Sequence, residues 1–212
     1  SPEVQTPAYK RMGYAARIGY GTESSHVDFI VLKAKDDETS LKSIPQNTDV
    51  LPGENLVAGL SSRMKFTQHL FWDADVATSI YTRDLRALPL SDDSNSIVNS
   101  FRSFLTVNTS SSMYNSYQTE LRYEAKTYKI KAKYRRVEPD FQSMGAYYFQ
   151  TDVENITIEP SLYLMKNKFK LLASFGHQRD NLLNKKSFTT KRIIGNLGFD
   201  WNISKVFGLN AL

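Results

Sequence analysis

The residues YQTELRYEAKTYKIKAKYR, from Tyr117 to Arg135, decide the fold class of this chain. Apolar and polar side chains alternate along both halves of the stretch, with a break near Lys126 and Thr127. Because successive side chains of a β-strand point to opposite faces, this alternation predicts two strands, each with one apolar and one charged face. The stretch is therefore predicted to form an antiparallel hairpin with a tight turn.

A two-residue loop at Lys126 and Thr127 fixes the register of this hairpin. Acidic side chains then lie opposite basic ones on one face, and apolar side chains lie opposite each other on the other face. The expected pairs are Glu124 with Lys129, Glu120 with Lys133, Arg122 with Lys131, Tyr123 with Ile130, and Leu121 with Ala132. The charged face is a ladder of seven residues, Glu120, Arg122, Glu124, Lys129, Lys131, Lys133 and Arg135.

Similar alternation recurs along the chain and predicts about ten strands. Their apparent length of about ten residues or more exceeds the five to six usual in soluble sheets. The connections alternate between tight turns, as at Lys126, and long loops at 36–53, 84–106 and 137–152. Long loops on one side and short turns on the other are typical of outer-membrane barrels. We therefore expect residues 1–212 to form an all-β, antiparallel transmembrane β-barrel region with the charged ladder facing the lumen.

Composition narrows the alternatives. The mean hydropathy of −0.43 is uninformative, because half the strand positions of a membrane barrel face water. No apolar run approaches the roughly 20 residues of a membrane-spanning helix, so only a barrel could span a bilayer. Cysteine is absent, which excludes disulfides, thiolate metal sites and a cysteine nucleophile. The net charge of +5 is spread along the chain rather than clustered, so no nucleic-acid partner is expected.

Two other interpretations remain open. A soluble closed barrel or sandwich that turns its apolar side inward and binds a small apolar ligand shows the same alternation. In such a protein the charged ladder would face solvent. Strand length and loop asymmetry favour the membrane interpretation, within which a passive diffusion pore is a further alternative.

Aromatic residues and two loops are the candidate contact sites. Tyr and Trp concentrate at bilayer interfaces, and five lie towards the ends of predicted strands on the apolar face, namely Trp72, Tyr117, Tyr128, Tyr134 and Trp201. In the loop at 84–106, Ile97, Phe101 and Phe104, with Val98 and Leu105, have the spacing of a short helix with one apolar side. The next long loop carries Phe141, Met144, Tyr147 and Tyr148, too apolar to face only water. We expect at least one loop to contact another chain or fold into the barrel mouth.

No catalytic signature is present. His26, His69 and His177 are isolated, without the spacing of a zinc site, and neither a nucleophile elbow nor a phosphate-binding glycine loop occurs. We expect no enzyme activity, cofactor or metal. The last strand, which follows a turn at Ser204 and Lys205, is shorter than the nine to eleven residues needed to cross a membrane. It predicts that the chain is part of a larger barrel, incomplete at its C-terminal end.

Three stretches resemble portions of the large outer-membrane β-barrel proteins of Bacteroidota. They are YRRVEPDFQSMGAYYFQTDVENITI (134–158), FGHQRDNLLNKKSFTTKRIIGNLGFDWNISKVFG (175–208) and LPGENLVAGL (51–60). The resemblance implies a Gram-negative outer membrane, with the chain as a scaffold or conduit in an export, assembly or uptake complex. Its implied partners are outer-membrane lipid and other outer-membrane or periplasmic proteins.

Overall fold

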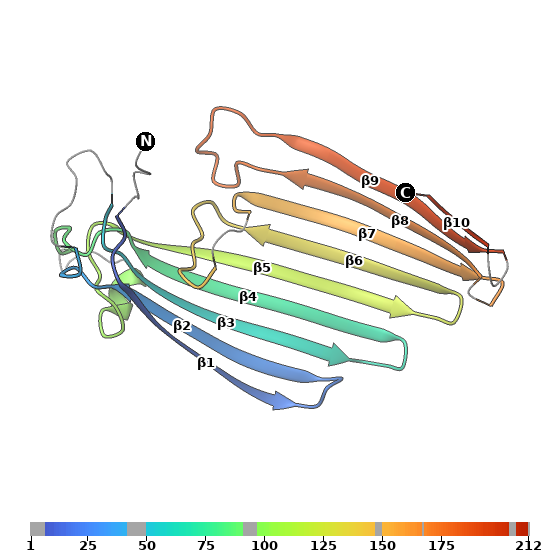
Figure 1. Ribbon diagram of the computed structural model, residues 1–212, viewed down its shortest axis with the longest axis horizontal. Helices are drawn as coiled ribbons and strands as arrows, with labels where there is room; N and C mark the ends of the chain where they lie inside the picture. Colours follow the sequence, from blue (N-terminus) through green and yellow to red (C-terminus); the bar gives the residue numbers. More distant parts are fainter. Residues whose placement is uncertain are drawn as a thin grey trace.

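The chain forms one ten-stranded antiparallel sheet in which every strand pairs with its neighbours in sequence (Figure 1). The computed structural model describes residues 7–41, 50–90, 97–146, 150–166, 168–203 and 207–211. The expected all-β, antiparallel class is confirmed, but the sheet is open, because β1 and β10 are its two edges. The strands are β1 (Arg11–Gly21), β2 (His26–Asp36), β3 (Glu54–Lys65), β4 (Leu70–Thr82), β5 (Ser111–Glu124), β6 (Tyr128–Val137), β7 (Val153–Leu164), β8 (Phe169–Arg179), β9 (Lys191–Asn202) and β10 (Gly208–Ala211).

The predicted hairpin register is confirmed in every pair. In the β5–β6 ladder Glu124 lies opposite Lys129 and Leu121 lies opposite Ala132, as the two-residue loop requires. Strands β1 to β9 are 10 to 14 residues long. The alternation of the sequence therefore corresponds to long, regular strands.

Turns and loops separate to opposite ends of the sheet (Figure 1). Residues 66–69 join β3 to β4, whereas residues 83–110 join β4 to β5. The other long loops lie at 37–53, 138–152 and 180–190. We call the two ends the short-turn end and the long-loop end.

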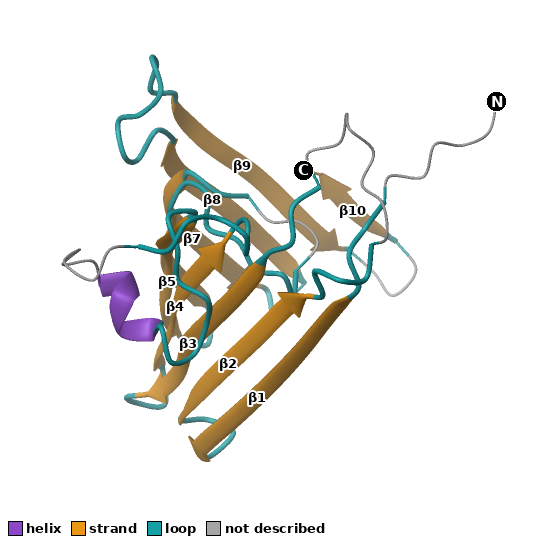
Figure 2. Cartoon of the chain, turned by 90° about the vertical axis from the view of Figure 1, so that its left-hand side faces the viewer, coloured by secondary structure: helices purple, strands orange, loops and turns teal. Residues whose placement is uncertain are grey.

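The register gives the sheet one apolar and one charged face. Starting from the hairpin, the pairs place Trp72 of β4 beside Leu121, and Asp73 beside Glu120. Figure 2 shows the strands arranged in an open arc, with the helix η1 (Ile97–Phe101) on its outer side. Because residues of η1 pack against Ile80 on the apolar face, the apolar face is convex and the charged face is concave.

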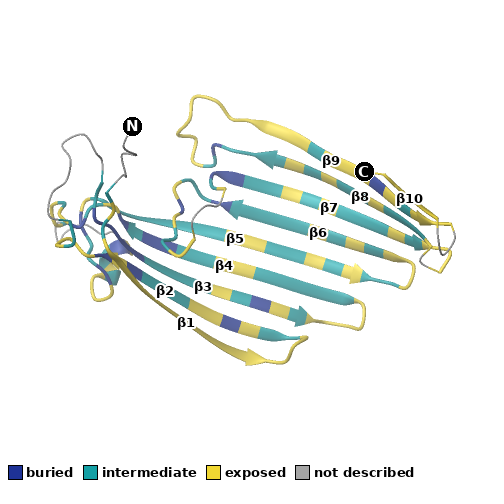
Figure 3. Cartoon of the chain, in the orientation of Figure 1, coloured by how far each residue is buried: buried dark blue, intermediate teal, exposed yellow. Residues whose placement is uncertain are grey.

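Among the described residues, buried apolar side chains gather only near the long-loop end. On the convex face Val98 and Leu105 pack on Ile80, and on the concave face Phe141 packs with Val137 and Val153. Elsewhere the described sheet is a single layer, and Figure 3 shows exposed positions recurring along the middle of the strands. Apolar side chains that face outward stay exposed as a result.

The expected helix and strand β7 each contain a local irregularity. Ile97 and Phe104 are 66% and 60% exposed, whereas Val98 and Leu105 pack on Ile80. The helix is a 3₁₀ turn that ends at Phe101, so residues three apart align and only part of the expected set reaches the sheet. In β7, pairing with β8 skips Glu159 and Pro160 and resumes in the same register, because proline has no amide hydrogen to donate.

Candidate functional site

The predicted charged ladder lies on the concave face and forms a connected network. Lys129 pairs with Glu124 at 2.5 Å, and Arg122 approaches the same carboxylate at 3.5 Å. Lys133 lies 3.6 Å from Glu120. Arg135 is the exception, since it forms no ion pair with any residue that the structure describes.

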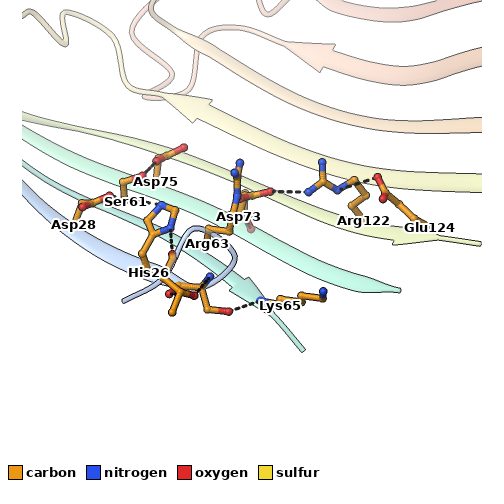
Figure 4. Close-up of polar contacts among 12 residues, drawn as sticks. His26, Asp28, Ser61, Arg63, Lys65, Asp73, Asp75, Arg122 and Glu124 are labelled. Carbon is orange, nitrogen blue, oxygen red and sulfur yellow. Dashed lines mark hydrogen bonds and ion pairs between the residues drawn. The ribbon is translucent and has the colours of Figure 1, made fainter. Parts of the chain in front are cut away.

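The network extends over neighbouring strands, beyond the residues predicted from the sequence. Arg63 of β3 pairs with Asp73 of β4 at 2.6 Å, and Arg122 lies 3.8 Å from the other oxygen of that carboxylate (Figure 4). On the same face, at the other edge of the hairpin, Glu159 of β7 accepts Lys133 at 2.9 Å and Lys131 at 3.4 Å. The alternation of each strand contained the signal for these residues. The contacts of Arg122 with Asp73 and of Lys131 with Glu159 were missed because long loops, which fix no register, connect β4 to β5 and β6 to β7.

The same face continues to β2, where Asp28 is buried under two basic groups. Arg17 donates to Asp28 at 2.6 Å, and His26 lies 3.6 Å from the same oxygen. His26, Arg63, Asp73 and Glu120 also line a polar hollow of about 270 Å³. Among the described residues no group of His, Asp and Glu has the arrangement of a metal site.

Aromatic side chains gather at the short-turn end of the convex face. The Trp72 indole donates to the Thr119 hydroxyl at 2.7 Å, and Tyr128 stacks on Tyr123 with ring centroids 5.8 Å apart. Trp201 meets the edge of Phe169 at 6.3 Å. Three of the five predicted aromatic residues therefore lie at the short-turn end of the convex face.

The two remaining predicted aromatics lie elsewhere on this face. Tyr134 lies towards the long-loop end of β6, where its hydroxyl donates to Glu154 at 3.1 Å. Tyr117 departs from the expected position near a strand end, because β5 begins earlier than expected and leaves Tyr117 in its middle.

A charged border closes the apolar face towards the long-loop end. Glu154 of β7 accepts Arg136 at 3.0 Å and Arg179 at 2.5 Å. On the same face, but nearer β1, Glu54 is only 1% exposed and lies between Lys33 at 3.4 Å and Lys35 at 3.7 Å. The apolar band of the convex face is therefore bounded by aromatic rings at one end and by ion pairs at the other.

Two adjacent residues of β3 fasten two long loops to opposite faces. The Glu54 carboxylate accepts the amide of Thr106 at 2.8 Å, which holds the loop of η1 on the convex face. The Asn55 side chain accepts the amide of Met144 at 2.9 Å on the concave face, and Ser79 donates to the carbonyl of Gln142 at 2.5 Å. The loop that carries Phe141 and Met144 thus folds inward over the concave face. Tyr147 and Tyr148 lie outside the described residues.

The loops after β6 and β8 are joined by one buried carboxylate. Asp152 pairs with Lys186 and accepts the amide of Leu182 at 2.9 Å. Burial by itself would raise the pKa of Asp152, but these hydrogen bonds outweigh it and lower the pKa below its ordinary value. The pKa of Lys186 is raised, chiefly by its hydrogen bond to Asp152.

Comparison with known proteins identifies no relative. No protein-family model matches the chain, and no curated protein and no solved structure is significantly similar to it. Within the described residues, no helix has the length and apolar character needed to cross a membrane.

Proposed function

We propose that this chain forms the wall of a β-barrel in a Gram-negative outer membrane and acts as a scaffold or conduit in an export, assembly or uptake complex. The observation that carries the proposal is the opposite chemistry of the two faces. The convex face is apolar and uncovered, with Ile18 72% and Ile193 91% exposed, whereas the concave face carries the ion-pair network. Apolar side out and polar side in is the arrangement of a barrel in lipid.

The dimensions of the apolar band agree with this role. On β9 the convex positions run from Ile193 to Trp201, which at about 3.4 Å per residue is about 27 Å along the strand. With the strand tilt of about 40° found in membrane barrels, the band is about 21 Å high, close to the usual height of about 25 Å.

The soluble alternative needs the apolar face on the inside of the arc. The packing of the η1 loop on the convex side supports the reverse orientation. In water, a continuous apolar face of this size would promote aggregation. Lipid is the occupant that covers it without further protein.

Tryptophan fluorescence tests the orientation. Both tryptophans of the chain, Trp72 and Trp201, belong to the convex face. In vesicles of brominated phosphatidylcholine we expect strong quenching of both, and little additional quenching by acrylamide from the aqueous phase. Quenching by acrylamide alone would contradict the proposal.

A matched pair of variants provides the control. Leu171 and Leu172 are neighbours in β8, but Leu171 pairs with Phe199 on the convex face and Leu172 with Gly198 on the concave face. With Trp72 and Trp201 replaced by phenylalanine, Leu171→Trp is expected to be quenched by the brominated lipid and Leu172→Trp by acrylamide. If the same agent quenched both variants equally, a bilayer that contacts only the convex face would be excluded.

A further inference from the structure

The concave face contains an apolar hollow that the charge network does not explain. Its volume is about 400 Å³, and it lies beneath the inward-folded loop at the long-loop end. Apolar side chains and one glycine provide most of its lining, and Phe141 comes from the loop that covers it. The principal lining residues are Ile30, Leu32, Val57, Gly59, Phe141 and Ala146.

The strand register explains why a hollow forms at this position. One row across the sheet reads Ile30, Gly59, Ala77, Ser116 and Val137, so small residues form its centre. Gly59 provides the flattest point of this floor, because an added Cβ there would meet nothing closer than 3.5 Å. The space above this floor is empty. Larger side chains at both ends of the row, and the loop above, border it.

The next row towards the short-turn end supplies the polar rim. It reads Ser61, Asp75, Gln118 and Arg135, and Asp75 and Arg135 both line the hollow. Asp75 accepts the Ser61 hydroxyl at 2.6 Å, and Arg135 pairs with no described residue. Two strand spacings separate these opposite charges, about 9.5 Å between their backbones.

We propose that this hollow binds a short apolar peptide with free termini. The peptide carboxylate pairs with Arg135, its ammonium group pairs with Asp75, and an apolar side chain fills the space above Gly59. An extended dipeptide spans about 7 Å. This length is shorter than the separation of the two backbones, and the side chains of Asp75 and Arg135 bridge the difference. As the cargo site of a conduit this assignment rests on the proposed function, whereas binding itself does not require the membrane.

Calorimetric titration of the purified full chain with leucyl-leucine tests the proposal. We expect saturable binding of this dipeptide and no binding of N-acetyl-leucyl-leucine amide, which lacks both charges. Asp75→Asn and Arg135→Gln are each expected to weaken binding about tenfold, the effect of losing one charged hydrogen bond. Decanoate, which has the carboxylate and an apolar chain but no ammonium group, is expected to bind more weakly and to be insensitive to Asp75→Asn.

A second pair of variants separates the hollow from general effects on folding. Gly59→Leu fills the floor and is expected to abolish binding with the sheet intact, as checked by circular dichroism. Gly13→Leu is the matched control: Gly13 lies on the same face, an added Cβ meets nothing closer than 3.6 Å, and it does not line the hollow. We expect it to bind leucyl-leucine as the parent chain does.

Three results would overturn the proposal: no binding of leucyl-leucine, equal binding of the blocked peptide, or undiminished binding by a folded Gly59→Leu variant. Each is independent of the lipid-quenching result, so the binding site and the membrane orientation can fail separately.

Discussion

The two faces of the sheet differ in chemistry although they alternate along the same strands. The convex face places apolar side chains next to one another from β1 to β9, and only its long-loop end carries ion pairs. The concave face places opposite charges next to one another, as at Arg63 and Asp73. The difference teaches that one set of strands presents two opposite chemistries, and that among the described residues loops pack on the sheet only near its long-loop end.

A charge placed on each face in turn is expected to have the largest effect. Leu197 and Asn196 are neighbours in β9, with Leu197 on the convex and Asn196 on the concave face. In a bilayer, Leu197→Arg is expected to reduce the free energy of unfolding by about 2–4 kcal/mol, because it buries a cation in hydrocarbon. Asn196→Arg is expected to change it by less than about 0.5 kcal/mol.

Urea unfolding of both variants in lipid vesicles measures this contrast. A similar loss for the two substitutions would remove the distinction between the faces. A loss in Asn196→Arg alone would reverse it.

The two docked loops sharpen the same comparison. Asn55→Ala removes the bonds to the loop on the concave face, and Glu54→Gln weakens the hold on the loop of η1 on the convex face. Asn55→Ala is expected to cost about 1–3 kcal/mol, since the buried amide of Met144 loses its acceptor. Glu54→Gln is expected to cost less, because glutamine keeps one acceptor oxygen and loses only the charge that faces Lys33 and Lys35. Hydrogen exchange should accelerate at residues 138–146 in Asn55→Ala and at residues 97–107 in Glu54→Gln.

If either substitution accelerated exchange in both loops, the two loops would not be held independently by Asn55 and Glu54. The adjacent position of the two residues makes them matched controls for each other.

The smallest expected effect is a pH dependence confined to the long-loop end. Because the pKa of Asp152 is lowered in the folded chain, its contact with Lys186 is fully present above the ordinary value of 3.8 and is lost as the pH falls through the lowered pKa. The contact is expected to remain intact between pH 5 and 8, because the lower limit of this range lies about one unit above the ordinary pKa of Asp152. Residues 180–190 should then exchange more slowly than in Asp152→Asn.

Hydrogen exchange corrected for its intrinsic pH dependence measures this difference. In strong acid the exchange rates of residues 180–190 in the parent chain should approach those of Asp152→Asn. Equal rates in the two proteins at neutral pH would show that the contact contributes nothing.

Particular elements show how far sequence reasoning reached. The β5–β6 register was predicted pair by pair, because a two-residue loop leaves the chain one choice. Glu159 was missed as a member of the charge network, since a long loop joins β7 to the hairpin. Arg63 and Asp28 pair across short turns, but long loops separate their hairpins from β5 and β6. The expected helix forms as a short 3₁₀ turn, which leaves Ile97 and Phe104 exposed.

The sequence by itself determined that the chain forms antiparallel strands and which side chains within a strand share a face. A period of two is a local property of extended backbone and needs no distant contact. Only the tertiary structure decided which face is convex, which long loop lies on which face, and where small residues from three strands meet to leave the hollow. These features arise from the curvature of the whole sheet and from contacts between residues far apart in the chain, which no local pattern encodes.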